Sequence, residues 1–319
     1  TYCSDMSPQQ GESDQRRSGR VKHATKAVRS ALRRYPPEIV ASLLRKPHPT
    51  GAPMRDVLTE LSPSGPAVSW LGHGSVVVGL DDTIVAVDPV LSDRIGPRVG
   101  KRTVGLRRLA PPPLGPDSLK GVDLVLITHA HFDHLDRPTL VELADQRTTV
   151  IVPKRCKRLI PKGFCRVIEL GAGESYRQGE ATVWAVQPRH WGARTWLDRR
   201  RGACSYCIER AGRRVLFAGD TADTNTFDGM SGLDLAVFGI GAYDPWEHMH
   251  ATPEQAWRMF QASGARYLLP VHHSTFPLSD EPIDEPMKRL LMAAGEERDR
   301  VIIARLGEID VVLENEAAS

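Results

Sequence analysis

The 319-residue sequence has no apolar run of about 18 residues, the length that a membrane-spanning helix needs. Its N-terminus lacks the apolar core and cleavage site of a secretory signal. Its five cysteines are scattered and odd in number, which argues against a disulfide framework. These absences predict a soluble, cytoplasmic protein with free thiols, and a hydrophobic content of 41% is enough to bury a large core.

The formal net charge is only +3, and the charges are unevenly placed. Residues 1–50 hold ten Lys or Arg against four Asp or Glu, whereas the remainder holds 32 against 35. We therefore predict a basic, partly disordered leader with short amphipathic helices over residues 1–50, followed by one folded domain over residues 51–319. The leader has two interpretations: peripheral contact with an anionic membrane, or packing on the domain with its charges solvated.

Short apolar segments alternate with helical ones from residue 67 onward. Strands are predicted, among others, at residues 67–80, 82–91 and 121–128, with a closing pair over 300–313. Helical spacing marks residues 137–145, 252–264 and 285–297. Because strands are followed by helices in both halves, we predict an α/β fold in which two sheets pack face to face with helices outside.

The segment LVLITHAHFDHLD, residues 124–136, begins as a buried strand and continues into an unusual turn. The turn holds His129, His131, Asp133 and His134 within six positions. A single histidine there would be an ordinary loop residue, but four donors exceed what a turn needs. Imidazole and carboxylate are preferred zinc ligands, so the segment predicts a metal site.

Three further donors each follow a predicted strand: His190, Asp220 and His272. Taken singly, each has a plain interpretation as a capping or core residue. Strand ends, however, are where rigid scaffolds present functional side chains. With the first turn, the set contains five histidines and two aspartates, enough for a two-metal hydrolytic centre.

These residues carry a resemblance to the metallo-β-lactamase superfamily of dinuclear zinc hydrolases. Within it, the sequence most resembles the N-acyl-phosphatidylethanolamine-hydrolysing phospholipase D group and its bacterial relatives, over roughly residues 67–310. The matching segments are WLGHGSVVV, DPVLSDR, HWGARTWLDRR, FAGDTAD, GIGAYDPWEHMHATPEQA and VHHSTF.

The resemblance implies an αβ/βα sandwich of two mixed β-sheets and a division of the metal ligands. One zinc ion would be held by His129, His131 and His190, the other by Asp133, His134 and His272, with Asp220 bridging. Two Zn²⁺ ions per chain are expected, with Mn²⁺ or Fe²⁺ as alternatives.

The resemblance also suggests residues around the metals. Asp88 would accept an N–H from a ligating histidine, although a turn role before Pro89 is an equal alternative. His250 would act with Asp133 in catalysis, meeting an anionic oxygen as a cation, although a plain role as a loop histidine is an alternative. The candidate substrate-binding residues are His73, Trp191, Arg194, Arg199 and His273. His273 and Ser274 replace the Trp and Gly of the family pattern, which leaves the substrate open.

Two runs of basic residues follow segments that carry proposed site residues. They are Arg94, Arg98, Lys101, Arg102, Arg107 and Arg108, then Arg194, Arg199, Arg200 and Arg201. Because guanidinium groups match phosphate oxygens, an anionic small-molecule or lipid substrate is favoured. Nucleic acid is not favoured, because stacking aromatics do not interleave the basic runs.

Three functions remain open at this point. The first is a phospholipase D-like phosphodiesterase that uses a metal-bridging hydroxide. The second is a zinc lactonase, β-lactamase-like amidase or esterase with the same nucleophile. The third is a non-catalytic metal-binding interaction protein, which the complete ligand set disfavours. The sequence does not predict an oligomeric state.

Overall fold

The computed structural model describes Arg33, Pro36, Pro37, Val40 and residues 60–61, 67–195 and 198–311. The four described residues of the leader are helical, and the Arg33 guanidinium lies 3.5 Å from the Asp280 carboxylate. The rest of the leader lies outside the described residues, so its membrane contact stays a prediction. Among the described residues, every helix is too short or too polar to span a bilayer.

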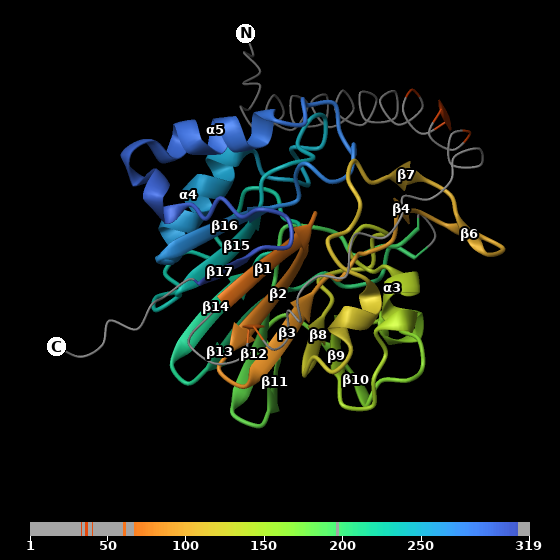
Figure 1. Cartoon of the computed structure of the whole chain (residues 1–319). Helices are drawn as coiled ribbons and strands as arrows, with labels where there is room; N and C mark the ends of the chain where they lie inside the picture. Colours follow the sequence, from red (N-terminus) through yellow and green to blue (C-terminus); the bar gives the residue numbers. More distant parts are fainter. Residues whose placement is uncertain are drawn as a thin grey trace, which may run out of the picture.

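Two mixed sheets form the body of the molecule (Figure 1). The larger sheet consists of β1 (Ala67–Gly72), β2 (Ser75–Leu80), β3 (Thr83–Val87), β8 (Leu124–Leu126), β9 (Thr149–Pro153), β10 (Arg166–Leu170) and β17 (Ile309–Val311). Its order is β10-β9-β8-β3-β2-β1-β17. The smaller sheet consists of β11 (Ser175–Gln178), β12 (Ala181–Val186), β13 (Ser205–Arg210), β14 (Arg213–Phe217), β15 (Leu235–Gly239) and β16 (Tyr267–Val271), in sequence order.

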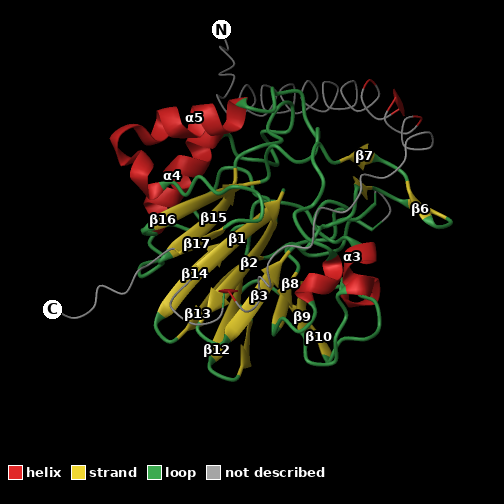
Figure 2. Cartoon of the chain, in the orientation of Figure 1, coloured by secondary structure: helices red, strands yellow, loops and turns green. Residues whose placement is uncertain are grey.

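The helices lie outside the sheets, as Figure 2 shows. They are α3 (Arg137–Glu142), α4 (Pro253–Ser263) and α5 (Glu285–Ala294), with 3-10 helices η1 (Pro116–Leu119), η2 (Lys157–Leu159) and η3 (Gly295–Arg300). Two short ribbons complete the fold: β4 (Arg94–Ile95) with β7 (Leu106–Arg107), and β5 (Arg98–Val99) with β6 (Arg102–Thr103). The predicted αβ/βα sandwich is confirmed.

The alternation of side chains along each strand builds the layers. Val76 and Val78 belong to the cluster between the sheets, together with Val215 and Phe217 of the smaller sheet. Val77, pointing the other way, belongs to the outer cluster that includes residues of α3. Because both faces of the central strands are covered, their sequences are almost continuously apolar.

Two predicted elements were wrong. Residues 67–80 are two strands, β1 and β2, joined by a turn at which Gly72 and His73 have φ values of 99° and 55°. Within the described residues 300–311, one strand forms, β17, while Val301 makes only an isolated bridge to Leu268. The prediction of free thiols is confirmed for the four described cysteines.

The helix α4 begins with a capping box at Thr252, two residues after His250. The Thr252 hydroxyl accepts a hydrogen bond from the Gln255 backbone N–H, and the Gln255 side chain accepts one from the Thr252 N–H. Thr252→Ala leaves a helix donor unsatisfied and should lower the free energy of unfolding by about 1 kcal/mol. Urea unfolding measures the loss. Thr252→Ser, which keeps the acceptor, should lose distinctly less, and equal losses would contradict this role.

Candidate metal centre

The seven predicted donors come together at one edge of the sandwich. Each lies in the segment that follows a strand: β8 for the first four, then β12, β14 and β16. Because β14, β15 and β16 are parallel, as are β3, β8 and β9, the carboxyl ends of these strands reach the same edge. The sheet pairing therefore gathers residues that are far apart in the sequence.

The first group of donors consists of His129, His131, His190 and Asp220, whose ligand atoms all lie within 4.8 Å of one another. His129 Nε2 lies 2.8 Å from His131 Nδ1, and His190 Nε2 lies 3.4 Å from the same atom. The other ring nitrogen of His190, Nδ1, lies 3.0 Å from the Met249 carbonyl oxygen, which orients the imidazole. This group matches the ligand set expected for one ion.

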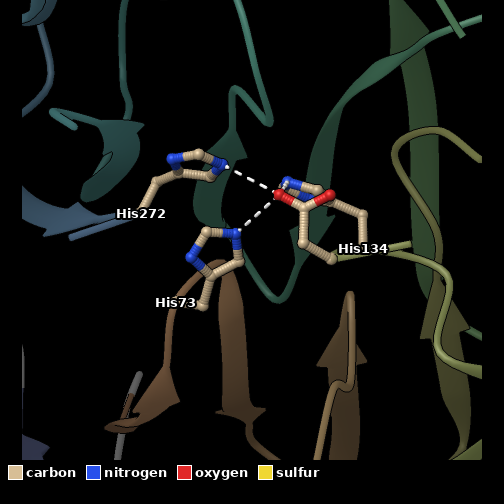
Figure 3. Close-up of side chains that lie close together, drawn as sticks. His73, His134 and His272 are labelled. Carbon is tan, nitrogen blue, oxygen red and sulfur yellow. Dashed lines mark hydrogen bonds and ion pairs between the residues drawn. The ribbon is translucent and has the colours of Figure 1, made fainter. Parts of the chain in front are cut away.

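The second group contains the three expected donors and one more, His73. His272 Nε2 lies 3.5 Å and His134 Nε2 3.7 Å from Asp133 Oδ2. His73 Nε2 is closer to that oxygen, at 2.9 Å. Figure 3 shows the rings of His73, His134 and His272 converging on this point.

Asp220 lies between the two groups. Its Oδ2 is 3.5 Å from His129 Nε2 and 3.2 Å from His134 Nε2, while Oδ1 is 3.3 Å from His272 Nε2. The carboxylate is buried, and its two oxygens lie close to histidines of both groups. This is the arrangement that a bridging ligand requires.

Several polar atoms at the centre of the cluster fit metal ions as their partners. His134 Nε2, His272 Nε2 and Asp220 Oδ2 are buried, and within the described part of the chain they have no hydrogen-bond partner. Leaving buried polar atoms unsatisfied is costly, so such atoms call for explanation. Their convergence, and their identity as imidazole nitrogens and a carboxylate oxygen, suit divalent transition-metal ions.

The predicted contact of Asp88 is present. Its Oδ2 lies 2.7 Å from His134 Nδ1, and Asp88 also accepts hydrogen bonds from the Thr128 N–H and hydroxyl. Accepting from Nδ1 fixes the tautomer and leaves Nε2 of His134 facing the cluster.

Charge is strongly coupled within the cluster. Burial disfavours protonated His134, but the carboxylates of Asp220, Asp88 and Asp133 outweigh burial and raise its pKa well above the usual range. Burial also opposes ionisation of Asp220, yet the surrounding histidines, led by His134, hold its pKa well below the usual range. The carboxylates thus attract positive charge to this point, a role that a metal cation fills in place of protons.

A cavity of about 690 Å³ opens onto the cluster. His131, Asp133, Asp220 and His272 form part of its wall. Most of the remaining wall is apolar and includes Ile95, Pro97, Val104, Leu106, Phe132, Trp191, Trp246, Met249 and Leu278. Among the described residues that line it, Arg199 is the only Lys or Arg.

Only some of the predicted substrate-binding residues line the cavity. Trp191 and Arg199 line it, whereas His73, Arg194 and His273 do not. The Arg194 guanidinium donates to the carbonyls of Ala130 and Leu135 and stacks 4.1 Å from the Phe132 ring, so it braces the metal-binding turn. Arg194 thus lies outside the cavity wall, and its contact with substrate stays a prediction.

The other two residues also lie outside the cavity wall. His273 stacks on Trp70 with 4.9 Å between ring centroids and lines a different, small pocket. His73 is 1% exposed and belongs to the metal cluster.

Three arginines of the first basic run do not line the cavity. Arg94 and Arg108 are buried, where Arg94 donates to the Gly105 carbonyl and Arg108 to the Val90 and Leu71 carbonyls. Arg107 pairs with Asp93 at 3.3 Å. Arg94 and Arg108 therefore support the backbone and Arg107 is paired with a carboxylate, so these three arginines do not favour an anionic substrate.

His250 lines the cavity next to the cluster, with Nδ1 3.8 Å from Asp220 Oδ2. Burial lowers the pKa of its imidazole to about 3, an effect that exceeds the attraction of Asp220. Within the chain a neutral imidazole is therefore favoured at His250, and the expected cationic role stays a prediction. A neutral imidazole at this place can still donate an N–H to an oxygen.

His73 is the cluster residue whose place the sequence did not reveal. Its own N–H donates to the Thr275 hydroxyl, and its carbonyl accepts from the Trp70 indole and the His272 N–H. A Cβ on Gly74 would approach the His134 ring to 3.0 Å, closer than an ordinary van der Waals contact, so glycine suits the close packing here. The usable signal was the Gly-His-Gly interruption of an otherwise apolar run.

His73→Leu should lower metal content selectively. The His73 imidazole lies 2.9 Å from Asp133 Oδ2, so its loss leaves the Asp133 carboxylate without the group that orients it. The metal content should then fall from about two ions per chain toward one. Elemental analysis after dialysis measures the change. His73→Gln, whose amide also donates, should retain more metal than His73→Leu. Unchanged stoichiometry in a folded His73→Leu variant would contradict the role.

Comparison with known proteins agrees with the architecture of the site. A family model for a β-lactamase superfamily domain matches residues 83–273. An uncharacterized protein of Mycobacterium tuberculosis is 36% identical over 256 residues, covering 76% of this chain and 68% of that protein. The N-acyl-phosphatidylethanolamine-hydrolyzing phospholipase D 1 of Caenorhabditis elegans is 29% identical over 275 residues, covering 78% of this chain and 76% of that protein.

A solved structure supports the same fold. A metallo hydrolase from Ignicoccus hospitalis, 21% identical, superposes with a TM-score of 0.56 and covers 77% of this chain and 97% of its own. Together with the match of the family model and the His/Asp cluster, these similarities show that the chain belongs to the metallo-β-lactamase superfamily, as a metal-dependent hydrolase.

Proposed function

We propose that the protein is a dinuclear, zinc-dependent phosphodiesterase of the phospholipase D type, acting on a diester with a large apolar group. The observation that carries this proposal is the cavity of about 690 Å³, which is largely apolar and has the metal cluster in its wall. A reacting bond at the cluster would place the rest of the substrate against apolar side chains. The Caenorhabditis elegans relative, a phospholipase D named for hydrolysing N-acyl-phosphatidylethanolamine, supports the same substrate class.

Two divalent ions, when bound, lower the pKa of a shared water and polarise a phosphoryl oxygen. Asp220 would hold both ions through its central carboxylate. His129, His131 and His190 would complete one site, and Asp133, His134 and His272 the other. Around this centre, the chain supplies orientation: Asp88 fixes His134, and His73 holds Asp133.

His250 would act on the substrate directly. It lines the cavity beside Asp220, and its neutral imidazole can donate a hydrogen bond to an oxygen on which negative charge develops. Trp191 and Phe132 line the same cavity and would exclude water from the reacting bond. This division separates the group that stabilises charge from the groups that bind the apolar part.

A zinc lactonase, amidase or esterase is the second candidate. The observation in its favour is the near absence of Lys and Arg from the described cavity lining, where Arg199 stands alone. A neutral ester or lactone can bind without further positively charged side chains in the cavity. The two candidates share one nucleophile and differ in the charge of the substrate.

A substrate panel on metal-loaded protein separates the candidates. It includes N-acyl-phosphatidylethanolamine, bis(p-nitrophenyl) phosphate, medium-chain p-nitrophenyl esters, lactones and a chromogenic cephalosporin. The proposal expects the long-chain phosphodiester to have the highest kcat/KM, because the cavity binds its apolar part. Higher kcat/KM for esters or lactones than for every phosphodiester would replace the proposal with its alternative.

Arg199→Met should raise KM for an anionic diester while leaving kcat nearly unchanged. A cation contact that is equal in ground and transition states affects binding alone, by about three- to tenfold for one exposed charge. Arg200→Met is the matched control, because Arg200 is the exposed neighbour that does not line the cavity. Steady-state kinetics measure both. Equal effects of the two variants, or equal effects on a neutral ester, would contradict an anionic substrate.

A further inference from the structure

We propose that the hairpin formed by residues 94–107, here called the basic hairpin, docks on an anionic phospholipid surface. It comprises the ribbon β4-β7 at its base and β5-β6 at its tip. In Figure 1 the β6 end projects from the body of the molecule. Docking is independent of the catalytic assignment, but its use in delivering a lipid diester rests on the proposed function.

The tip carries positive charge that faces solvent. Residues 94–108 contain six Lys or Arg and no Asp or Glu. At the base, arginines are buried against carbonyls or paired with Asp93, as described above. At the tip, Arg98, Lys101 and Arg102 are exposed, and no carboxylate of the described chain pairs with them. Three exposed cations on one turn match the negative potential of anionic lipids.

The tip also presents an apolar side chain. Val99 is 67% exposed, between Arg98 and the turn at Gly100, where φ is 61°. An exposed valine within a basic turn has no packing role in the described chain. It suits an interface at which cations contact headgroups and a small apolar group enters the boundary with the acyl chains.

The base of the same hairpin is a wall of the cavity. Ile95, Pro97, Val104 and Leu106 line it, and Pro97 is two residues from Val99. The apolar lining therefore begins close to the point at which the tip would touch lipid. A lipid diester leaving the bilayer beside the hairpin would meet apolar surface on its way to the metal cluster.

Nucleic acid fits the hairpin less well. The segment 94–108 contains no Phe, Tyr or Trp on which bases could stack. Its exposed apolar groups, Pro97 and Val99, contribute nothing to the binding of a phosphate backbone. An anionic bilayer uses both the charges and the valine.

Vesicle sedimentation of the full chain tests the proposal. Phosphatidylcholine vesicles with and without phosphatidylglycerol are compared. The triple variant Arg98→Glu, Lys101→Glu, Arg102→Glu should bind the anionic vesicles at least about tenfold more weakly than the parent. Val99→Asp should weaken binding as well. Because the leader is present in every variant, its contribution is common to all.

The matched control reverses three exposed charges elsewhere, with Arg158→Glu, Lys162→Glu and Arg166→Glu near η2 and β10. Vesicle binding is measured at physiological salt, which screens the long-range repulsion that any charge reversal adds. Under these conditions the control variant should bind anionic vesicles like the parent. Equal binding by the parent and the hairpin variant would overturn the proposal. An equal loss of vesicle binding in the control variant would also overturn it. So would a hairpin variant that loses binding to a single-stranded oligonucleotide but not to anionic vesicles.

Turnover of bis(p-nitrophenyl) phosphate keeps the two proposals separate. The tip residues do not line the cavity, so the hairpin variant should hydrolyse this soluble diester at the parental rate if the protein is a phosphodiesterase. Vesicle binding without diester hydrolysis would leave docking standing and remove the proposed function. Diester hydrolysis with no hairpin-dependent binding would do the reverse.

Discussion

The burial of the Asp220 carboxylate among imidazoles is the constraint on which the rest of the site depends. An ionised carboxylate with 2% of its side chain exposed requires nearby positive charge or hydrogen-bond donors. Nitrogens of His129, His134 and His272 lie within 3.5 Å of it, and these residues come from two different strands. The carboxylate is stable only if the sheets bring those strand ends together, so folding and assembly of the metal centre are one requirement.

The backbone around the centre accepts unusual conformations. Asp88, His73 and His272 all have positive φ values although none is glycine. Each is held by interactions with another part of the site: Asp88 with Thr128, and His73 with His272 and Thr275. Such conformations persist where surrounding structure determines them, and they cluster at functional sites. Here they aim side chains from strand ends into one small volume.

Local sequence was enough to predict the fold class and the seven donors that the structure brings together. Four of these donors occur within six residues, and the others follow apolar strands, so spacing and strand patterning reveal them together. His73 was harder to place, because its turn interrupts an apolar run by only three residues. The places of the arginine side chains could not be predicted for a different reason. Arg108 and Arg194 bind backbone carbonyls instead of facing the cavity, and this choice depends on contacts between segments that are distant in the sequence.

The central claim is that one carboxylate joins two metal ions at the wall of an apolar cavity. Electron paramagnetic resonance of the protein loaded with Mn²⁺ tests it most directly, because two ions that share a bridging ligand are magnetically coupled. The account predicts a coupled signal at about two ions per chain, which Asp220→Ala converts to uncoupled or weakly bound ions. An uncoupled spectrum at full loading, or saturation at a single ion, would contradict it.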